Sequence, residues 1–253
     1  MSVTVGAIME LLEGIAPLSY ALEWDNAGLL AGSRKDPVDC VLCALDLTQA
    51  VLEEAVSIGA QMIVTHHPIL FRGAKNLCTD TPEGKLLCDL AQSGIALASM
   101  HTNFDLIHPG VNDALAEAIG LSGVKALEDG ICMGELMPES LSAVKLRVEN
   151  ALGGSVRMYG SPEKRISRVA VLGGAGGDYI LTAQQSGAEV FITGEIAYHR
   201  ALDAVAAGMC VLEAGHAATE APAIPVLARG LQIAANDVQY NLRVLCSKRM
   251  LFL

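Results

Sequence analysis

The sequence predicts an α/β fold made of two similar halves, and two features of the 253 residues carry this prediction. Apolar runs rich in Val, Ile, Leu and Cys alternate with amphipathic helical stretches, which is the pattern of parallel strands joined by helices. The order of these elements in the first half also recurs in the second. We therefore expect two α/β domains from an internal duplication, over residues 1–125 and 126–253, with an approximate boundary and halves that can interlock.

Each half is predicted to contain two helices and three strands. Helices are expected where apolar residues recur at helical spacing, and strands where short continuous apolar runs indicate burial on both faces of a parallel sheet. In the first half, in chain order, the elements cover residues 5–15, 38–47, 49–58, 61–67 and 94–100. In the second half, they cover residues 141–152, 168–173, 179–186, 189–195 and 208–214. A long loop over residues 68–81 occurs only in the first half.

The duplication is visible as a direct match between segments. Residues 59–67 align without a gap with residues 187–195, and residues 94–100 correspond to residues 208–214. Gly-Ala before a β-branched run is common where a helix leads into a strand, so part of this similarity is general to α/β proteins.

A His-x-x-x-carboxylate sequence follows the last of these strands in each half and is the more specific part of the repeat. It runs from His101 to Asp105 in the first half and from His216 to Glu220 in the second. A duplicated unit could supply ligands from both copies to one site, so we expect a metal site in the cleft between the halves.

Three short polar clusters each follow an apolar run that is predicted to be a strand. They cover residues 65–68, 101–105 and 215–220, and they contain four of the six histidines of the chain. Open α/β sheets place their active sites at the carboxyl ends of their strands. Imidazoles and carboxylates without a thiolate suit Zn, Mn, Fe or Ni. The sequence therefore predicts a site for two divalent metal ions per chain.

Hydrolysis is the reaction class expected of such a site. Two metal ions about 3.5–4 Å apart activate a shared water as hydroxide, by lowering its pKa toward about 7, and polarise a carbonyl, imine or phosphoryl oxygen. His101 is the candidate catalytic residue, because an imidazole with an unperturbed pKa near 6.5 can carry protons. Direct metal ligation by His101 is the alternative. A single histidine at a strand end is more often structural than a ligand, so the prediction depends on the three clusters occurring together.

Composition limits the partners of the chain. With 52% hydrophobic and 18% charged residues, the sequence is that of a packed globular protein. A net charge of −11 without any Lys/Arg cluster argues against nucleic acid and leaves a small-molecule substrate as the expected partner. Gly or charged residues interrupt each long apolar stretch, so no membrane partner is expected. Seven cysteines without a spaced framework predict free thiols in a reducing compartment, the cytoplasm.

Three further features leave alternatives open. Residues 173–178 form a glycine-rich segment between a strand and a helix, where backbone N–H groups can bind phosphate. The segment matches no phosphate-binding signature, and a tight turn is the simpler explanation. Trp24, the only tryptophan, lines the active-site cavity or belongs to a turn. His199 lies in the cavity or on a helix surface, and His108 is expected to be an ordinary turn residue.

Taken together, these motifs resemble those of the Nif-three-like family, whose members are often described as GTP cyclohydrolase I type 2 homologues. The resemblance covers nearly the whole chain. The matching segments are residues 23–29, 65–68, 101–105, 193–199 and 215–220. The chain is similar to the short form of the family, because it has no room for the additional domain that longer members insert between the halves. Glu195 stands where the family pattern often has Asp.

The resemblance implies two similar α/β domains, a dinuclear metal centre in the cleft between them, and a toroidal homohexamer built as a trimer of dimers. Carried over residue by residue, the metal ligands that it implies are His66, His67, Asp105, His216 and Glu220, with His101 close by.

Functions of different classes fit these expectations. The first is a metal-dependent hydrolase that acts on a nucleotide, a pterin-like compound or a related small molecule. The second is a non-catalytic metal-binding assembly, such as a metallochaperone or a cofactor-delivery scaffold. A phosphoesterase of the Asp-His-His type is disfavoured, because Thr65 occupies the position where that motif needs its carboxylate.

Overall fold

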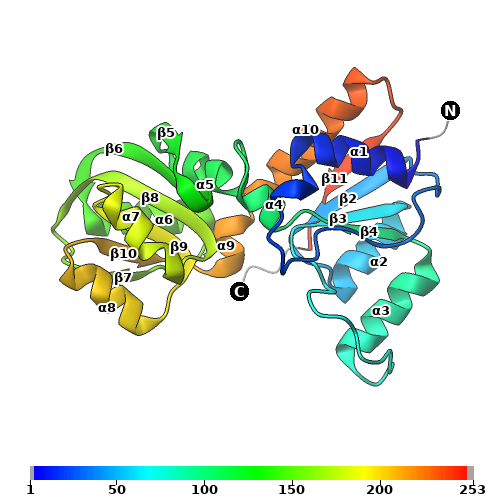
Figure 1. Cartoon of the computed structure of the whole chain (residues 1–253), viewed down its shortest axis with the longest axis horizontal. Helices are drawn as coiled ribbons and strands as arrows, with labels where there is room; N and C mark the ends of the chain where they lie inside the picture. The colour runs from blue at the N-terminus through cyan, green and yellow to red at the C-terminus, as the bar shows by residue number, and fades with distance from the viewer. Residues whose placement is uncertain (1–2, 250–253) are drawn as a thin grey trace. The chain divides into compact units, whose positions relative to one another are not determined.

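A computed structural model describes residues 3–249 (Figure 1). These residues form two compact units, each built around its own sheet, so the predicted α/β fold is confirmed. Unit 1 contains residues 3–104 and 224–249, and unit 2 contains residues 105–223. The chain returns to the first sheet at its end. The predicted halves that meet near residue 125 divide the chain by sequence repeat rather than by contacts, and their duplication stays a prediction.

The sheet of unit 1 has five strands in the order β1-β4-β3-β2-β11. Four neighbouring strands are parallel, and β1 runs antiparallel to β4. The strands are β1 Gly28–Ala31, β2 Cys40–Ala44, β3 Met62–Thr65, β4 Ala96–Ser99 and β11 Arg243–Cys246. Every residue of β2, β3 and β4 is buried, which explains why these strands read as continuous apolar runs.

Helices cover both faces of this sheet (Figure 1). On one face lie α1 (Val5–Ile15) and α10 (Ala223–Asp237), and on the other lie α2 (Gln49–Ile58) and α3 (Pro82–Ser93). Leu42, Ile63 and Leu97 of the sheet belong to one buried cluster with Leu52 of α2 and Leu90 of α3. The start of three helices is set by capping, because a threonine side chain accepts a hydrogen bond from the first turn. The caps are Thr4 for α1, Thr48 for α2 and Thr81 for α3.

The sheet of unit 2 has six strands in the order β5-β6-β8-β9-β10-β7. Its centre is parallel, with β9 between β8 and β10, and the remaining strands pair antiparallel. The strands are β5 Ser122–Ala126, β6 Cys132–Ser140, β7 Arg157–Tyr159, β8 Arg165–Ala175, β9 Val190–Glu195 and β10 Cys210–Glu213. The three parallel strands were predicted. The antiparallel ones were not, because their partly exposed residues form no continuous apolar run.

Alternation along β8 separates the two faces of this second sheet. Val169 and Val171 pack in a cluster with α5 (Val111–Ile119) and α6 (Leu141–Leu152). Ala170 and Leu172 point the other way, into a cluster with α7 (Ile180–Gln185) and α8 (Tyr198–Ala206). The sheet is therefore covered on both faces, as a largely apolar parallel centre requires.

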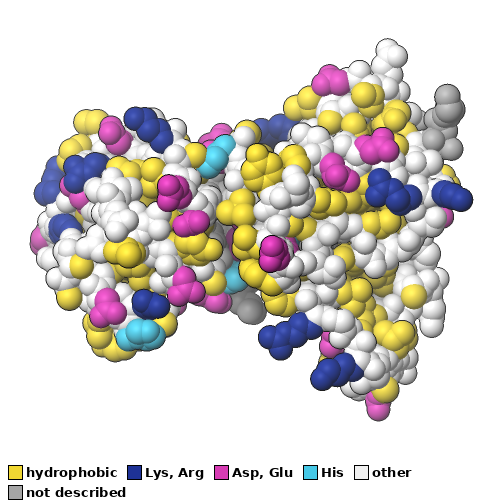
Figure 2. All heavy atoms as spheres, in the orientation of Figure 1, with side chains coloured by type: hydrophobic (Ala, Val, Ile, Leu, Met, Phe, Trp, Pro, Cys, Tyr) yellow, Lys and Arg dark blue, Asp and Glu magenta, His cyan; other side chains and the backbone are white. Residues whose placement is uncertain are grey.

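The surface carries mixed charge. On the face drawn in Figure 2, Lys and Arg side chains lie singly or in small groups among acidic and apolar ones. All seven cysteines are free thiols. Among residues 3–249, no helix is both long enough and apolar enough to cross a membrane.

Phe191 is the test position for the core of unit 2. It lies in β9, is fully buried, and packs in the cluster under α7 and α8. Phe191→Ala is expected to lower the free energy of unfolding by about 3–5 kcal/mol, because it removes a large side chain and leaves a cavity. Leu181→Ala on α7, where the side chain is 62% exposed, is expected to change it by less than about 0.5 kcal/mol. Urea unfolding followed by circular dichroism compares the two, and equal losses would contradict the assigned core.

Candidate metal centre

Three histidines gather at the carboxyl ends of two neighbouring strands in unit 1. His66 and His67 follow β3, and His101 follows β4 after Met100. The two strands are parallel and in register, with Thr65 opposite Ser99, so their ends lie side by side. The ring centroids are 4.9 Å apart for His66 and His67, 5.3 Å for His66 and His101, and 5.6 Å for His67 and His101. One ring nitrogen from each lies within 4.8 Å of the others.

Each of these imidazoles is oriented by a hydrogen bond at the same ring atom. Nδ1 of His66 donates to the carbonyl oxygen of Met100, at 2.8 Å. Nδ1 of His67 donates to the Asp46 carboxylate and Nδ1 of His101 to the Asp25 carboxylate, both at 2.8 Å. A ring that donates through Nδ1 presents the lone pair of Nε2, and this arrangement is typical of histidines that bind metals. The donor set of unit 1 therefore fits a metal ion.

Asp25 connects the loop before β1 to His101. Its side chain is fully buried, and its carboxylate also accepts hydrogen bonds from the backbone N–H and the hydroxyl of Thr102. Burial acts to raise the pKa of Asp25, but the hydrogen bonds from Thr102 and His101 outweigh it and hold the pKa below its usual value. The carboxylate therefore stays ionised and keeps the His101 ring in place.

The pKa of His101 is also held below its usual value. Burial is the main cause, and the neighbouring rings of His66 and His67 add to it, against the hydrogen bond to Asp25, which acts in the opposite direction. His101 is therefore neutral at neutral pH, and its Nε2 atom is in the form that can accept a proton or bind a metal.

A second donor group lies in unit 2, on the short helix α9 (His216–Glu220). His216 Nε2 lies 3.2 Å from Glu220 Oε1, one helical turn away. His216 Nδ1 lies 3.4 Å from Glu195 Oε2 at the end of β9. Glu220 is 4% exposed, whereas the side chain of Glu195 is mostly exposed. The helix therefore presents a buried carboxylate and an imidazole together.

Glycines in β8 and β9 let α9 approach the sheet this closely. A Cβ atom at Gly174 would lie 2.3 Å from Glu220 Oε1 and 3.3 Å from His216 Nε2. A Cβ atom at Gly194 would lie 2.8 Å from the Cα of His216. The Gly174 N–H donates to Thr219 Oγ1 at 3.0 Å. The glycine-rich segment was interpreted as a tight turn, but β8 continues through Gly174, and its glycines make room for the donor residues of α9.

Asp105 is the last residue of α4 (Thr102–Asp105) and the first of unit 2. Its carbonyl oxygen accepts a hydrogen bond from the Asn112 side chain at 3.3 Å. The pKa of Tyr179 is raised, first by burial and then by the charges of Asp129, Asp105 and Asp178.

Five of the six predicted site residues thus fall into two groups, and Asp105 is in neither. Unit 1 brings together His66, His67 and His101, and unit 2 brings together His216 and Glu220. The motif analysis assigns no role to Asp46, which follows β2 just as the histidines follow β3 and β4. A carboxylate just after a third parallel strand was the signal that could have identified it.

The other two histidines lie elsewhere in unit 2. His199 is exposed on α8, which agrees with the helix-surface alternative, and it lines a surface cavity together with Glu195. His108 lies in the connection between α4 and α5, where its Nδ1 donates to Asp113 at 2.8 Å.

Comparison with known proteins gives the family. The sequence profile of Duf34/NIF3 (NGG1p interacting factor 3) matches residues 3–250. The chain belongs to this family. The relationship inferred from the motifs is confirmed, and two curated relatives match along most of the chain. A protein of Clostridium acetobutylicum named GTP cyclohydrolase 1 type 2 homolog is 31% identical, over 98% of this chain and 97% of its own length. A protein of Clostridium perfringens with the same name is 33% identical, over 86% and 87%.

The fold of this NIF3 chain is also found in solved structures. The crystal structure of a hypothetical protein of Staphylococcus aureus matches with a TM-score of 0.94, at 28% identity, over 100% of both chains. The fold is therefore shared along the whole chain.

Gly174→Ala tests whether the space around Glu220 matters. The new Cβ atom would collide with Glu220 Oε1, and the backbone φ of +65° adds strain. Gly187→Ala is the matched control, because its φ is +84° but the space around it is open. We expect both variants to lose about 1–2 kcal/mol from the backbone alone and Gly174→Ala to lose more. Thermal unfolding and zinc titration separate the two, and identical behaviour would contradict the crowded site.

Asp25→Asn tests whether the hydrogen bond from His101 to the Asp25 carboxylate orients the imidazole. The amide keeps the shape of the carboxylate but removes the charged acceptor. If His101 binds a metal directly, which is the alternative to its role as proton carrier, metal affinity is expected to fall about 10- to 100-fold. Asp36→Asn is the control, because Asp36 accepts its hydrogen bond from Ser33 in a separate turn. Zinc competition with a chromophoric chelator gives both affinities. Unchanged affinity in Asp25→Asn would show that the carboxylate has no part in orienting a ligand.

Proposed function

We propose that this protein is a metal-dependent hydrolase that acts on a nucleotide or a related small molecule. In this proposal, the chain binds two divalent cations, of Zn, Mn, Fe or Ni. The proposed ligands are His66, His67, Asp105, His216 and Glu220. The observation that carries the proposal is the set of three adjacent imidazoles, each held at Nδ1 by an oxygen so that Nε2 is presented.

The chemistry of the donors supports metals over a purely structural role. Histidines without a thiolate, combined with the buried Glu220 carboxylate, form a set that suits borderline divalent cations. Bound cations would supply Lewis acidity and concentrated positive charge to an attacking water and to the polarised atom of the substrate. That charge would also allow an anionic substrate to bind to a chain with a net charge of −11.

His101 has the properties of a proton carrier in this reaction. Its Nδ1 hydrogen is committed to Asp25, so a proton taken from water would go to Nε2. The lowered pKa of the ring keeps it neutral before the reaction, and the ionised Asp25 would stabilise the imidazolium after it. Asp25 is therefore proposed as the residue that positions His101.

The relatives suggest the first substrate to try. The two clostridial relatives are named GTP cyclohydrolase 1 type 2 homologs, and hydrolytic opening of the GTP purine ring falls within the proposed class. We further propose that the protein works in the cytoplasm, which its free thiols support, and that it assembles as the homohexamer implied by the family resemblance.

Metal content per chain is the test of the centre. Wild type, His67→Ala, Glu220→Ala and the control His199→Ala are purified identically, desalted and measured by plasma mass spectrometry. We expect about two transition-metal ions per wild-type chain, a clear reduction in the first two variants and no change in His199→Ala. Wild type that is free of metal and cannot be reloaded would overturn the metal centre.

Turnover separates the hydrolase from a metal-handling protein. GTP and a panel of nucleotides are incubated with metal-loaded wild type and with Glu220→Ala, and the products are separated by liquid chromatography. A hydrolase gives products that disappear in the variant while its circular dichroism spectrum is unchanged. Reversible metal exchange without any turnover would favour the non-catalytic assembly. The His216 side chain is 36% exposed, which is compatible with such exchange, because a partner could reach it.

A further inference from the structure

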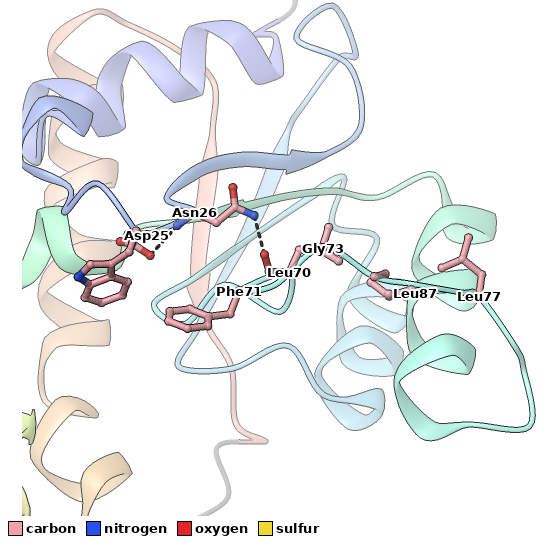
Figure 3. Close-up of a pocket in the computed structure, with 9 residues that line it drawn as sticks. Asp25, Asn26, Leu70, Phe71, Gly73, Leu77 and Leu87 are labelled. Atoms are coloured by element: carbon pink, nitrogen blue, oxygen red, sulfur yellow. Dashed lines mark hydrogen bonds between the residues drawn. The ribbon is translucent and has the colours of Figure 1, made fainter.

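A cavity of about 530 Å³ opens in unit 1 (Figure 3), and two of the rings that line it, Trp24 and Phe71, lie next to His101. Two loops line it, the one before β1 and the long one between β3 and α3. The first contributes Trp24, Asp25 and Asn26, and the second contributes Leu70, Phe71 and neighbouring small and apolar residues. Its volume lies in the range of small-molecule sites, which are mostly apolar with a few polar groups.

Two aromatic rings form the wall of this cavity nearest to His101. Trp24 and Phe71 meet edge to face, with centroids 5.5 Å apart and planes inclined by 61°. The centroid of the His101 ring lies 6.3 Å from that of Trp24 and 6.2 Å from that of Phe71. Both aromatic side chains are about half exposed, at 57% and 46%. Large rings left open to solvent in a corner next to a proton carrier offer faces on which a flat ligand can stack.

The corner is held in place by hydrogen bonds within unit 1. Asn26 Nδ2 donates to the carbonyl oxygen of Leu70 at 2.7 Å, which ties the two loops together next to Phe71 (Figure 3). Asp25, between Trp24 and Asn26 in the chain, accepts the hydrogen bond from His101. Trp24 and His101 are thus anchored through adjacent residues of one loop. The aromatic corner is preorganised relative to the candidate catalytic imidazole.

We propose that this cavity is the subsite for the planar ring of a nitrogen heterocycle of nucleobase size, which stacks on Trp24 and Phe71 beside His101. The inference rests on the proposed hydrolase for what then happens to the ring, but ring binding is measured independently of turnover. Arg72 and Lys75 are exposed on the loop that lines the cavity, and they favour a heterocycle that carries a phosphate. The probe is therefore guanosine monophosphate.

Trp24 makes the test direct, because it is the only tryptophan of the chain and its fluorescence reports on this cavity alone. Guanosine monophosphate is titrated into wild type, Phe71→Leu and Tyr198→Leu. We expect saturable quenching in wild type. In Phe71→Leu we expect binding to be weaker by about tenfold or more, because base stacking on an aromatic ring is lost. Tyr198→Leu removes an aromatic ring that is 67% exposed on α8 in unit 2, and we expect it to behave as wild type.

Two further measurements keep the inference open to failure. Ribose 5-phosphate carries the phosphate without the ring, and quenching by it as strong as that by guanosine monophosphate would overturn the proposal. Trp24→Phe keeps a stacking ring and Trp24→Ala does not, so calorimetry should find binding retained in the first and lost in the second. Absence of quenching in wild type, or equal affinity in Phe71→Leu, would also overturn it.

The outcome for the cavity can be distinguished from that for the hydrolase. Quenching that depends on Phe71 in a protein without turnover would leave the ring subsite standing and remove the hydrolase. Turnover of GTP without any change in Trp24 fluorescence would retain the hydrolase and remove the subsite.

Discussion

The parallel, in-register pairing of β3 with β4 is the constraint on which the candidate site depends. It places the residues that follow Thr65 next to those that follow Ser99, so histidines more than thirty positions apart become neighbours. Both strands are buried on both faces, which leaves their carboxyl ends as the place where polar side chains can emerge. A shift of one residue in this register would move the imidazoles out of their shared cluster.

Oxygen atoms from neighbouring segments then determine which nitrogen of each imidazole ring can bind a metal or a proton. Met100, Asp46 and Asp25 each accept a hydrogen bond from the Nδ1 atom of one histidine. These acceptors come from the ends of β4 and β2 and from the loop before β1. The site is therefore specified by the whole carboxyl edge of the sheet rather than by the histidines alone. The loop that contains Asp25 also contains Trp24, so it places the Trp24 ring beside His101.

In unit 2, the candidate donors lie on a helix that packs closely against the sheet. Its donors stand on a short helix, and a helix so close to a sheet is possible only where the sheet has no side chains to obstruct it. Gly174 and Gly194 provide that space under His216 and Glu220. Gly173 and Gly174 thus have a steric role at the candidate centre. A phosphate-binding role is not needed to explain them.

The sequence by itself determined the α/β class, the buried parallel strands and the identity of the candidate donors. It could do so because continuous apolar runs report burial on both faces, and because His and carboxylate residues directly after such runs are chemically distinctive. The antiparallel strands β5, β6 and β7 escaped prediction. β5 is exposed along its whole length, β6 and β7 mix exposed with buried or partly buried residues, and strands of this kind depend on the strands beside them.

Only the tertiary structure decided the roles of Asp25, Asp46, Trp24 and Gly174. Asp25 and His101 are 76 positions apart, and no local pattern relates them. Gly174 has its meaning from Glu220, which lies on another element, and the Trp24 and Phe71 rings meet through two separate loops. A sequence lists the groups that can do chemistry because composition and periodicity are local properties. Long-range contacts determine which nitrogen of a ring is hydrogen-bonded and which surface the ring faces. These contacts exist only once the sheets have formed.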